Sequence, residues 1–161
     1  MTTQNKTEAP GAEGRSRVHA RFGWTLLLLA MLFGAVMETL EGFRWAPLVG
    51  DAWRLRLWSL AHFHGAALGL VNLVYVQWAD ARALSEASRA RASRMLLLGS
   101  AALPLGFLLG GIGHPEGDPS LGILLSPVGA LLVLYTVAAQ TVAVWRGPAP
   151  GEGGGREGAG V

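Results

Sequence analysis

The stretch TLLLLAMLFGAVM, residues 25–37, decides the class of this chain. It carries no charge and lies within a longer apolar run, residues 22–43. That run is close to the ~20 residues that an α-helix needs to cross about 30 Å of hydrocarbon. It shows no period of two, so it does not resemble a strand of a lipid-exposed barrel. The run therefore predicts a transmembrane helix.

Three further apolar runs of similar length follow, at residues 57–79, 95–113 and 121–145. Together the four runs predict an all-α, integral membrane four-helix bundle over residues 21–146. Residues 1–20 have no apolar periodicity, and residues 147–161 (GPAPGEGGGREGAGV) are of low complexity. Both ends are predicted to be disordered cytoplasmic tails.

The composition supports a membrane protein and excludes several functions. Of the 161 residues, 51% are hydrophobic and 15% are charged, which is too apolar for a soluble domain of this size. The absence of cysteine removes disulfides, thiolate catalysis and thiolate haem ligation. The net charge is +2, but the basic residues lie beside the apolar runs and read as topology signals. No nucleic-acid partner is expected.

The distribution of lysine and arginine predicts the orientation. Three arginines lie between the first two runs: Arg44, Arg54 and Arg56. The other ten basic residues lie before the first run, between the second and third, or after the fourth. This asymmetry predicts that both termini are cytoplasmic, by the positive-inside rule. Residues 44–56 are expected to lie along the outer interface, where Arg44, Arg54 or Arg56 could instead pair with a haem propionate.

The ionisable residues of the spans are predicted to gather in one layer. Counted along the runs, four lie within about 10 Å of the outer boundary: Glu38, Glu41, His62 and His64. His114, at the outer end of the third run, could join them. The two glutamates could be an interfacial pair, metal ligands or proton carriers, and the deeper Glu38 is expected to be the protected one.

The segment AHFH, residues 61–64, gives the sharpest hypothesis about chemistry. His62 and His64 are about 200° apart on a helix, so they face different neighbours. Small residues follow on the side of His62, and Asn72 lies further along that side; bulky residues follow His64. The small stripe could admit a planar macrocycle, with His62 as axial haem ligand. The alternatives are a histidine that only bridges two helices, or a non-haem metal held by His62 or His64 together with Glu38, Glu41 and His114.

Two prolines lie in the later runs. Pro104 and Pro127 are predicted to kink or open their helices. Ser100 or Ser126 could then satisfy the carbonyls that the prolines leave without a donor.

Two resemblances bear on these residues. The segment Ala61-His62-Phe63-His64 is similar to a helix of subunit I of the haem-copper oxidases, in which two histidines on opposite faces ligate two haems. The other histidine motifs of that family are absent from this chain. A catalytic oxidase subunit is therefore excluded.

A broader resemblance, over residues 22–145, is to the small four-helix bacterial membrane proteins that include styrene-oxide isomerase and hydroxylaminobenzene mutase. Trp58, Ala61 and His62 match the segment that opens their second helix. In styrene-oxide isomerase that histidine ligates haem b, whose iron acts as a Lewis acid on an epoxide oxygen in a trimer. The resemblance implies haem b on His62, Asn72 as a pocket residue, a homo-oligomer and the bacterial inner membrane. His64 replaces the small residue of that family.

Three functional hypotheses follow. The first is a haem-binding membrane protein, in its most specific form a cofactor-dependent isomerase whose small lipophilic substrate enters from the lipid. The second is a non-enzymatic accessory subunit or assembly factor of a membrane complex, in which the small residues serve helix packing. The third is a proton or solute pathway that uses Glu38 and Glu41.

Overall fold

A computed structural model describes residues 10–78 and 84–146 of the chain, with side chains for residues 13–77 and 84–146. The elements in chain order are α1 (Pro10–Gly42), α2 (Ala46–Val49), α3 (Ala52–Trp78), α4 (Glu86–Gly110), the 3-10 turn η1 (Leu121–Leu124) and α5 (Leu125–Arg146). These described residues contain no strand. The all-α class predicted from the sequence is confirmed.

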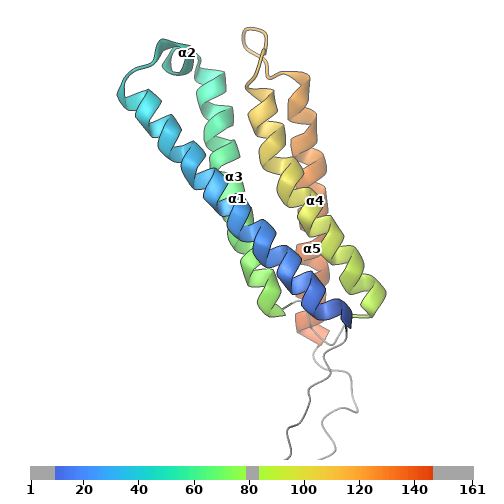
Figure 1. The fold of residues 1–161 in the computed structure, drawn as a ribbon. Helices are drawn as coiled ribbons and strands as arrows, with labels where there is room; N and C mark the ends of the chain where they lie inside the picture. Colours follow the sequence, from blue (N-terminus) through green and yellow to red (C-terminus); the bar gives the residue numbers. More distant parts are fainter. Residues whose placement is uncertain (1–9, 79–83, 147–161) are drawn as a thin grey trace, which may run out of the picture.

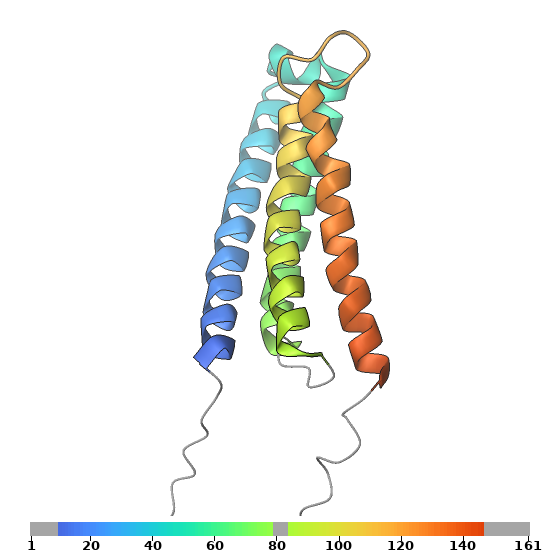
Figure 2. The ribbon, with the colours of Figure 1, turned by 90° about the vertical axis from the view of Figure 1, so that its right-hand side faces the viewer.

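The four long helices run side by side and alternate in direction (Figures 1 and 2). One end of the molecule, here called the loop end, carries residues 43–51 and 111–120. At the opposite, terminal end, α1 and α4 begin and α3 and α5 finish. All four helices are long and apolar enough to cross a membrane by length and composition. The shortest, α5, has 22 residues and is about 33 Å long.

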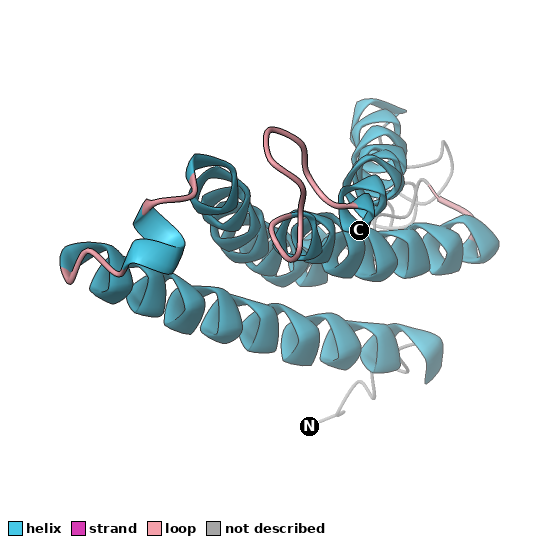
Figure 3. Ribbon diagram, turned by 90° about the horizontal axis from the view of Figure 1, so that it is seen from above, coloured by secondary structure: helices cyan, strands magenta, loops and turns pink. Residues whose placement is uncertain are grey.

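The helices form an open row rather than a closed ring (Figure 3). α1 packs on α3, α3 packs on α4, and α4 packs on α5. α1 touches α4 only slightly, and within the described chain the backbone of α5 does not come close to that of α1 or α3. The row therefore leaves a groove on each side, one between α1 and α4 and one between α3 and α5.

Glycines allow the backbones of paired helices to touch. A Cβ atom added at Gly69 of α3 would lie 3.0 Å from the Gly23 carbonyl of α1. On the other pair, a Cβ at Gly106 of α4 would lie 2.4 Å from the Ser126 backbone nitrogen of α5. Small residues at helix contacts are the usual means of close packing in membranes, where lipid provides no hydrophobic drive between helices.

Two details differ from the sequence predictions. α1 begins at Pro10, so the prediction of a disordered tail is wrong for residues 10–20; residues 1–9 and 147–161 lie outside the described residues. Pro127 does not kink its helix, because α5 begins at Leu125 and a first-turn proline costs no intrahelical bond. Pro104 does lie inside α4.

A serine does satisfy a carbonyl beside the internal proline. The Ser126 hydroxyl of α5 donates to the Leu103 carbonyl of α4 at 3.2 Å. The bond links the two helices next to Pro104, but the carbonyl that Pro104 leaves without a backbone donor is that of Ser100, four residues earlier. Ser100, the other serine considered, instead accepts a hydrogen bond from Asn72 of α3.

Candidate functional site

His62 lies half-buried on α3 at the edge of the groove between α1 and α4. Its Nδ1 is 2.8 Å from the Ala30 carbonyl of α1. The ring fits against Gly34, because a Cβ atom there would lie 2.3 Å from the His62 Cε1 atom. Any side chain at position 34 would displace the imidazole. The glycine therefore leaves the space that the His62 ring occupies between α1 and α3.

The hydrogen bond to Ala30 decides the tautomer of His62. A carbonyl oxygen only accepts, so Nδ1 must carry the proton and donate it. In the neutral imidazole, Nε2 then keeps its lone pair. Histidines that bind metals are commonly oriented in this way, with the second nitrogen donating to a carbonyl or a carboxylate. The tautomer of His62 is therefore compatible with ligation through Nε2.

The groove beside His62 has a volume of about 310 Å³ and is almost entirely apolar. Its walls come from α1, α3 and α4. His62 is the one histidine among its lining residues, which are otherwise aliphatic, aromatic, proline or glycine: Phe22, Leu26, Leu29, Ala30, Phe33, Ala61, Gly65, Ala101, Pro104, Leu105 and Leu108. An apolar cleft of this size with a single polar group is typical of a site for a small lipophilic molecule.

His64 faces a different helix from His62, as its place on α3 predicted. Its Nδ1 donates to the Leu60 carbonyl of its own helix at 2.8 Å. Its ring stacks on Phe107 of α4, with 5.0 Å between the ring centres. These contacts give His64 a packing role between α3 and α4.

The two glutamates of α1 do not join the histidines. Glu38 and Glu41 are both exposed, and neither carboxylate contacts a partner among the described residues. The expectation that Glu38 is protected is wrong, because its face of α1 points away from α3 and α4. Within residues 10–78 and 84–146, no three histidine, aspartate or glutamate side chains come together as a metal site.

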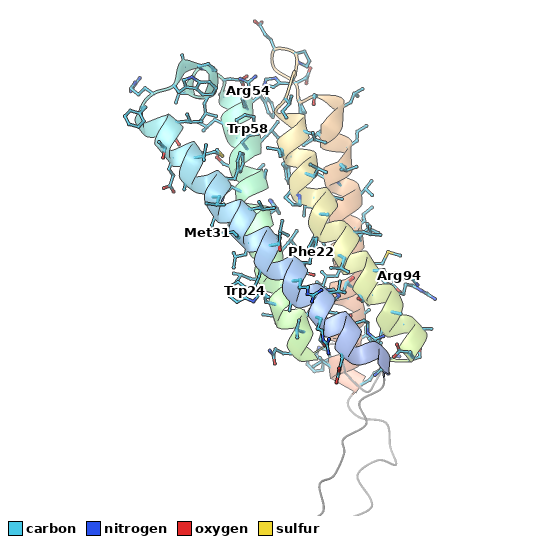
Figure 4. All side chains as sticks on the ribbon, in the orientation of Figure 1. Phe22, Trp24, Met31, Arg54, Trp58 and Arg94 are labelled. Carbon is cyan, nitrogen blue, oxygen red and sulfur yellow. The ribbon has the colours of Figure 1, made fainter. Side chains whose placement is uncertain are left out.

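Arg44 and Arg54, predicted as partners of a haem propionate, differ in their contacts. Arg44 is exposed, in a left-handed backbone conformation with φ of 53°. Arg54 belongs to the first turn of α3 and lies near Trp58 at the loop end (Figure 4). Its guanidinium donates to the Pro47 carbonyl at 2.6 Å and to the Gly111 carbonyl at 3.1 Å. Arg54 thus links the two loop segments, residues 43–51 and 111–120.

His114 also serves the loop end. Its Nε2 lies 2.8 Å from an Asp51 carboxylate oxygen, and its Nδ1 lies 2.8 Å from the Pro115 carbonyl. Only the protonated imidazole donates to both acceptors. The backbone amide of Arg54 donates to Asp51 at 2.9 Å and is the main reason that the pKa of Asp51 lies below its ordinary value. This cluster fastens the α1–α3 pair to the α4–α5 pair.

A second histidine site was missed by the sequence analysis. His19 of α1 is fully buried. Its Nδ1 lies 2.7 Å from the Asn72 Oδ1 atom of α3, and its Nε2 lies 2.8 Å from the Ser93 hydroxyl of α4. The ring of His19 also packs on Tyr75, with 4.5 Å between ring centres. Three helices thus meet at one buried polar cluster.

The hydrogen bonds of the His19 cluster are mutually consistent. The Asn72 amide nitrogen donates to the Leu68 carbonyl and to the Ser100 hydroxyl, each at 2.8 Å. Its oxygen must then accept from Nδ1 of His19, and Nε2 of His19 accepts from Ser93. A neutral His19 satisfies every one of these contacts. Asn72, predicted to line a cofactor pocket, is instead committed to this cluster and does not line the His62 groove.

A sequence signal for His19 existed. The buried residues of α1 share one helical face and are spaced by four, seven, four and three residues: His19, Gly23, Ala30, Gly34 and Met37. Extending the apolar face of the first span backwards by one turn reaches His19. The prediction that residues 1–20 form a tail concealed this position.

Comparison of the chain with protein-family models, with curated proteins and with solved structures finds no match.

Proposed function

We propose that this chain is a multi-pass membrane protein that binds haem b in the groove between α1 and α4, where His62 would hold it. The observation that carries the proposal is the hydrogen bond from His62 Nδ1 to the Ala30 carbonyl, which leaves Nε2 as a neutral nitrogen ligand. The cofactor itself is suggested by the resemblance of Trp58, Ala61 and His62 to the haem-binding segment of styrene-oxide isomerase.

The residues of the groove fit one face of a planar, apolar macrocycle. Ala30, Ala61 and Gly65 keep the surface beside His62 low, and Pro104 lies on the opposite wall. At about 310 Å³ the groove is at the small end of ligand sites, so a second protomer would cover the rest of the macrocycle. That arrangement agrees with the homo-oligomer that the resemblance implies.

The chain would supply binding and orientation, while the cofactor would supply the reaction chemistry. When bound, a ferric haem would supply a Lewis acid to an oxygen-containing substrate. The lining side chains are apolar, so they would exclude water and admit a lipophilic substrate from the bilayer. Arg54 is already bonded to two backbone carbonyls, which leaves the exposed Arg44 and Arg56 as the freer arginines for a propionate.

The test is the absorption spectrum of detergent-purified protein produced with abundant haem. We expect a Soret band in the wild type, its loss in His62→Ala, and its return when free imidazole is added to the variant, which a purely structural role would not produce. His64→Ala is the matched control and should keep most of the band, because His64 bonds its own helix. A colourless wild type, or equal haem content in both variants, would overturn the proposal.

A second candidate function is a non-enzymatic subunit of a membrane complex. The open row favours it, because the outermost helices α1 and α5 each pack against a single long neighbour over most of their length. Light scattering of the purified protein separates the two proposals. A colourless protein that is monomeric alone and binds stoichiometrically to one copurified membrane subunit would support the second.

A further inference from the structure

The groove on the other side of the row, between α3 and α5, has a volume of about 340 Å³. α4 forms its floor through Leu96, and Tyr75 separates the groove from the His19 cluster. None of the residues that line it is ionisable at neutral pH. The groove is therefore an uncharged slot within the part of the molecule predicted to lie in the membrane.

One polar side chain of this groove has unmet hydrogen-bonding capacity. The amide nitrogen and oxygen of Gln140 are both buried, and neither forms a hydrogen bond. The neighbouring hydroxyls differ, because Thr136 donates to the Ala92 carbonyl at 2.9 Å and Thr141 donates to the Val137 carbonyl at 2.9 Å. Leaving a buried donor or acceptor unpaired is unfavourable. Gln140 thus offers one donor group and one acceptor to a partner from outside the chain.

We propose that this groove binds an uncharged single-chain amphiphile whose head group both donates and accepts hydrogen bonds, of the class of long-chain primary amides. Such a head group pairs with the Gln140 amide through two hydrogen bonds, and the apolar walls take the hydrocarbon chain. Gln140 lines the groove, and its amide can turn about its broad terminal torsion to meet such a head group. An anionic head group would find no cation among the lining residues.

The position of Gln140 along α5 agrees with this ligand. Gln140 lies six residues before Arg146, the last residue of the helix, which is about 9 Å along the axis. Trp145, a residue type enriched at membrane interfaces, also lines the groove and is 86% exposed. The amphiphile would therefore hold its head group below the interface, with its chain directed along α3 and α5 into the bilayer.

The experiment is saturable binding of radiolabelled oleamide to the full-length protein in lipid nanodiscs, with unlabelled competitors. Methyl oleate has no donor in its head group, and oleate carries a charge. We expect the wild type to bind oleamide about tenfold more tightly than either competitor, the gain of two neutral hydrogen bonds. Gln140→Leu should bind all three alike, whereas Thr141→Val should behave as the wild type, because that hydroxyl is already bonded.

Three results would overturn the proposal. The first is equal affinity of the wild type for oleamide and methyl oleate. The second is unchanged head-group discrimination in Gln140→Leu. The third is a wild-type dimer that Gln140→Leu converts to a monomer, because a second copy of the chain would then occupy the groove. None of these measurements depends on whether His62 binds haem.

Discussion

At the scale of single residues, His19 of α1 and His62 of α3 have different roles. In His19, Nδ1 donates to Asn72 and Nε2 accepts from Ser93, so both ring nitrogens have a hydrogen-bond partner within the chain. His62 has Nδ1 bonded to the Ala30 carbonyl, no hydrogen-bond partner for Nε2 within the described residues, and a ring that lines the groove between α1 and α4. A satisfied histidine stabilises helix packing, whereas one with a free ligand atom can bind a further molecule.

The His19 cluster predicts a non-additive pair of substitutions. Asn72→Leu should lower the unfolding free energy by about 1–3 kcal/mol, because it leaves the Nδ1 proton of His19 buried without an acceptor. The double variant His19→Leu/Asn72→Leu should recover part of this loss, since no unpaired polar atom then remains between them. Thermal unfolding in detergent, followed by circular dichroism, measures both changes.

Ser59→Ala is the control for that cycle. Ser59 is exposed and its hydroxyl donates only to the Leu55 carbonyl of its own helix. The change should alter stability by less than about 0.5 kcal/mol. Additive effects of the His19 and Asn72 substitutions would show that the two side chains do not depend on each other.

At the scale of elements, the backbones of α4 and α5 approach each other more closely at their glycines than those of α1 and α3 do. Gly99, Gly106 and Gly129 each face backbone or β-carbon atoms of the opposite helix at less than 3 Å from where a Cβ would lie. The hydroxyls of Ser126 and Thr136 also donate hydrogen bonds to carbonyls of α4. The register of α5 on α4 is therefore fixed by backbone approach rather than by large side chains.

A glycine comparison tests this packing. Gly106→Ala should destabilise the protein by about 1–3 kcal/mol, because the new methyl group meets the Ser126 backbone and a backbone atom cannot rotate away. Gly14→Ala is the matched helical control, since a Cβ there meets nothing within 4 Å. It should be neutral or stabilising by up to about 1 kcal/mol, the difference in helix propensity. Guanidine or heat denaturation in detergent gives both values, and equal effects would contradict the close contact.

At the scale of the whole molecule, different polar interactions link the helices at the two ends of the row. The terminal end is held by the ion pair between Arg15 of α1 and Glu86 of α4. The loop end is held by His114, Asp51 and Arg54. Surface ion pairs contribute little each, so the row is held mainly by the helix contacts between these ends.

The orientation of the row in the membrane is a prediction that labelling can test. The chain has no cysteine, so single cysteines can be introduced without background. Glu116→Cys at the loop end should react with a membrane-impermeant maleimide in intact cells, because both termini are predicted to be cytoplasmic. Ala87→Cys at the start of α4 should react only after the cells are broken. The reverse pattern would contradict the topology inferred from the arginines.

The sequence by itself determined four long helices and the approximate limits of their apolar runs. Hydrophobic length decides whether a helix can span a bilayer, and that information is local in the chain. The same local geometry separated His62 from His64, because a spacing of two residues turns a helical side chain to another face. The first turns of α1 were not predicted from the sequence, because charged residues between their apolar positions obscure the helical periodicity.

Only the tertiary structure decided which faces the helices turn towards one another. Rotation of a helix about its axis is set by packing with its neighbours, since lipid accepts any apolar face equally. Glu38 is exposed for that reason, although its depth suggested protection. His19 is buried because Asn72 and Ser93, which are distant in the sequence, supply its hydrogen bonds. The open row and its two grooves likewise follow from contacts between helices that no single span encodes.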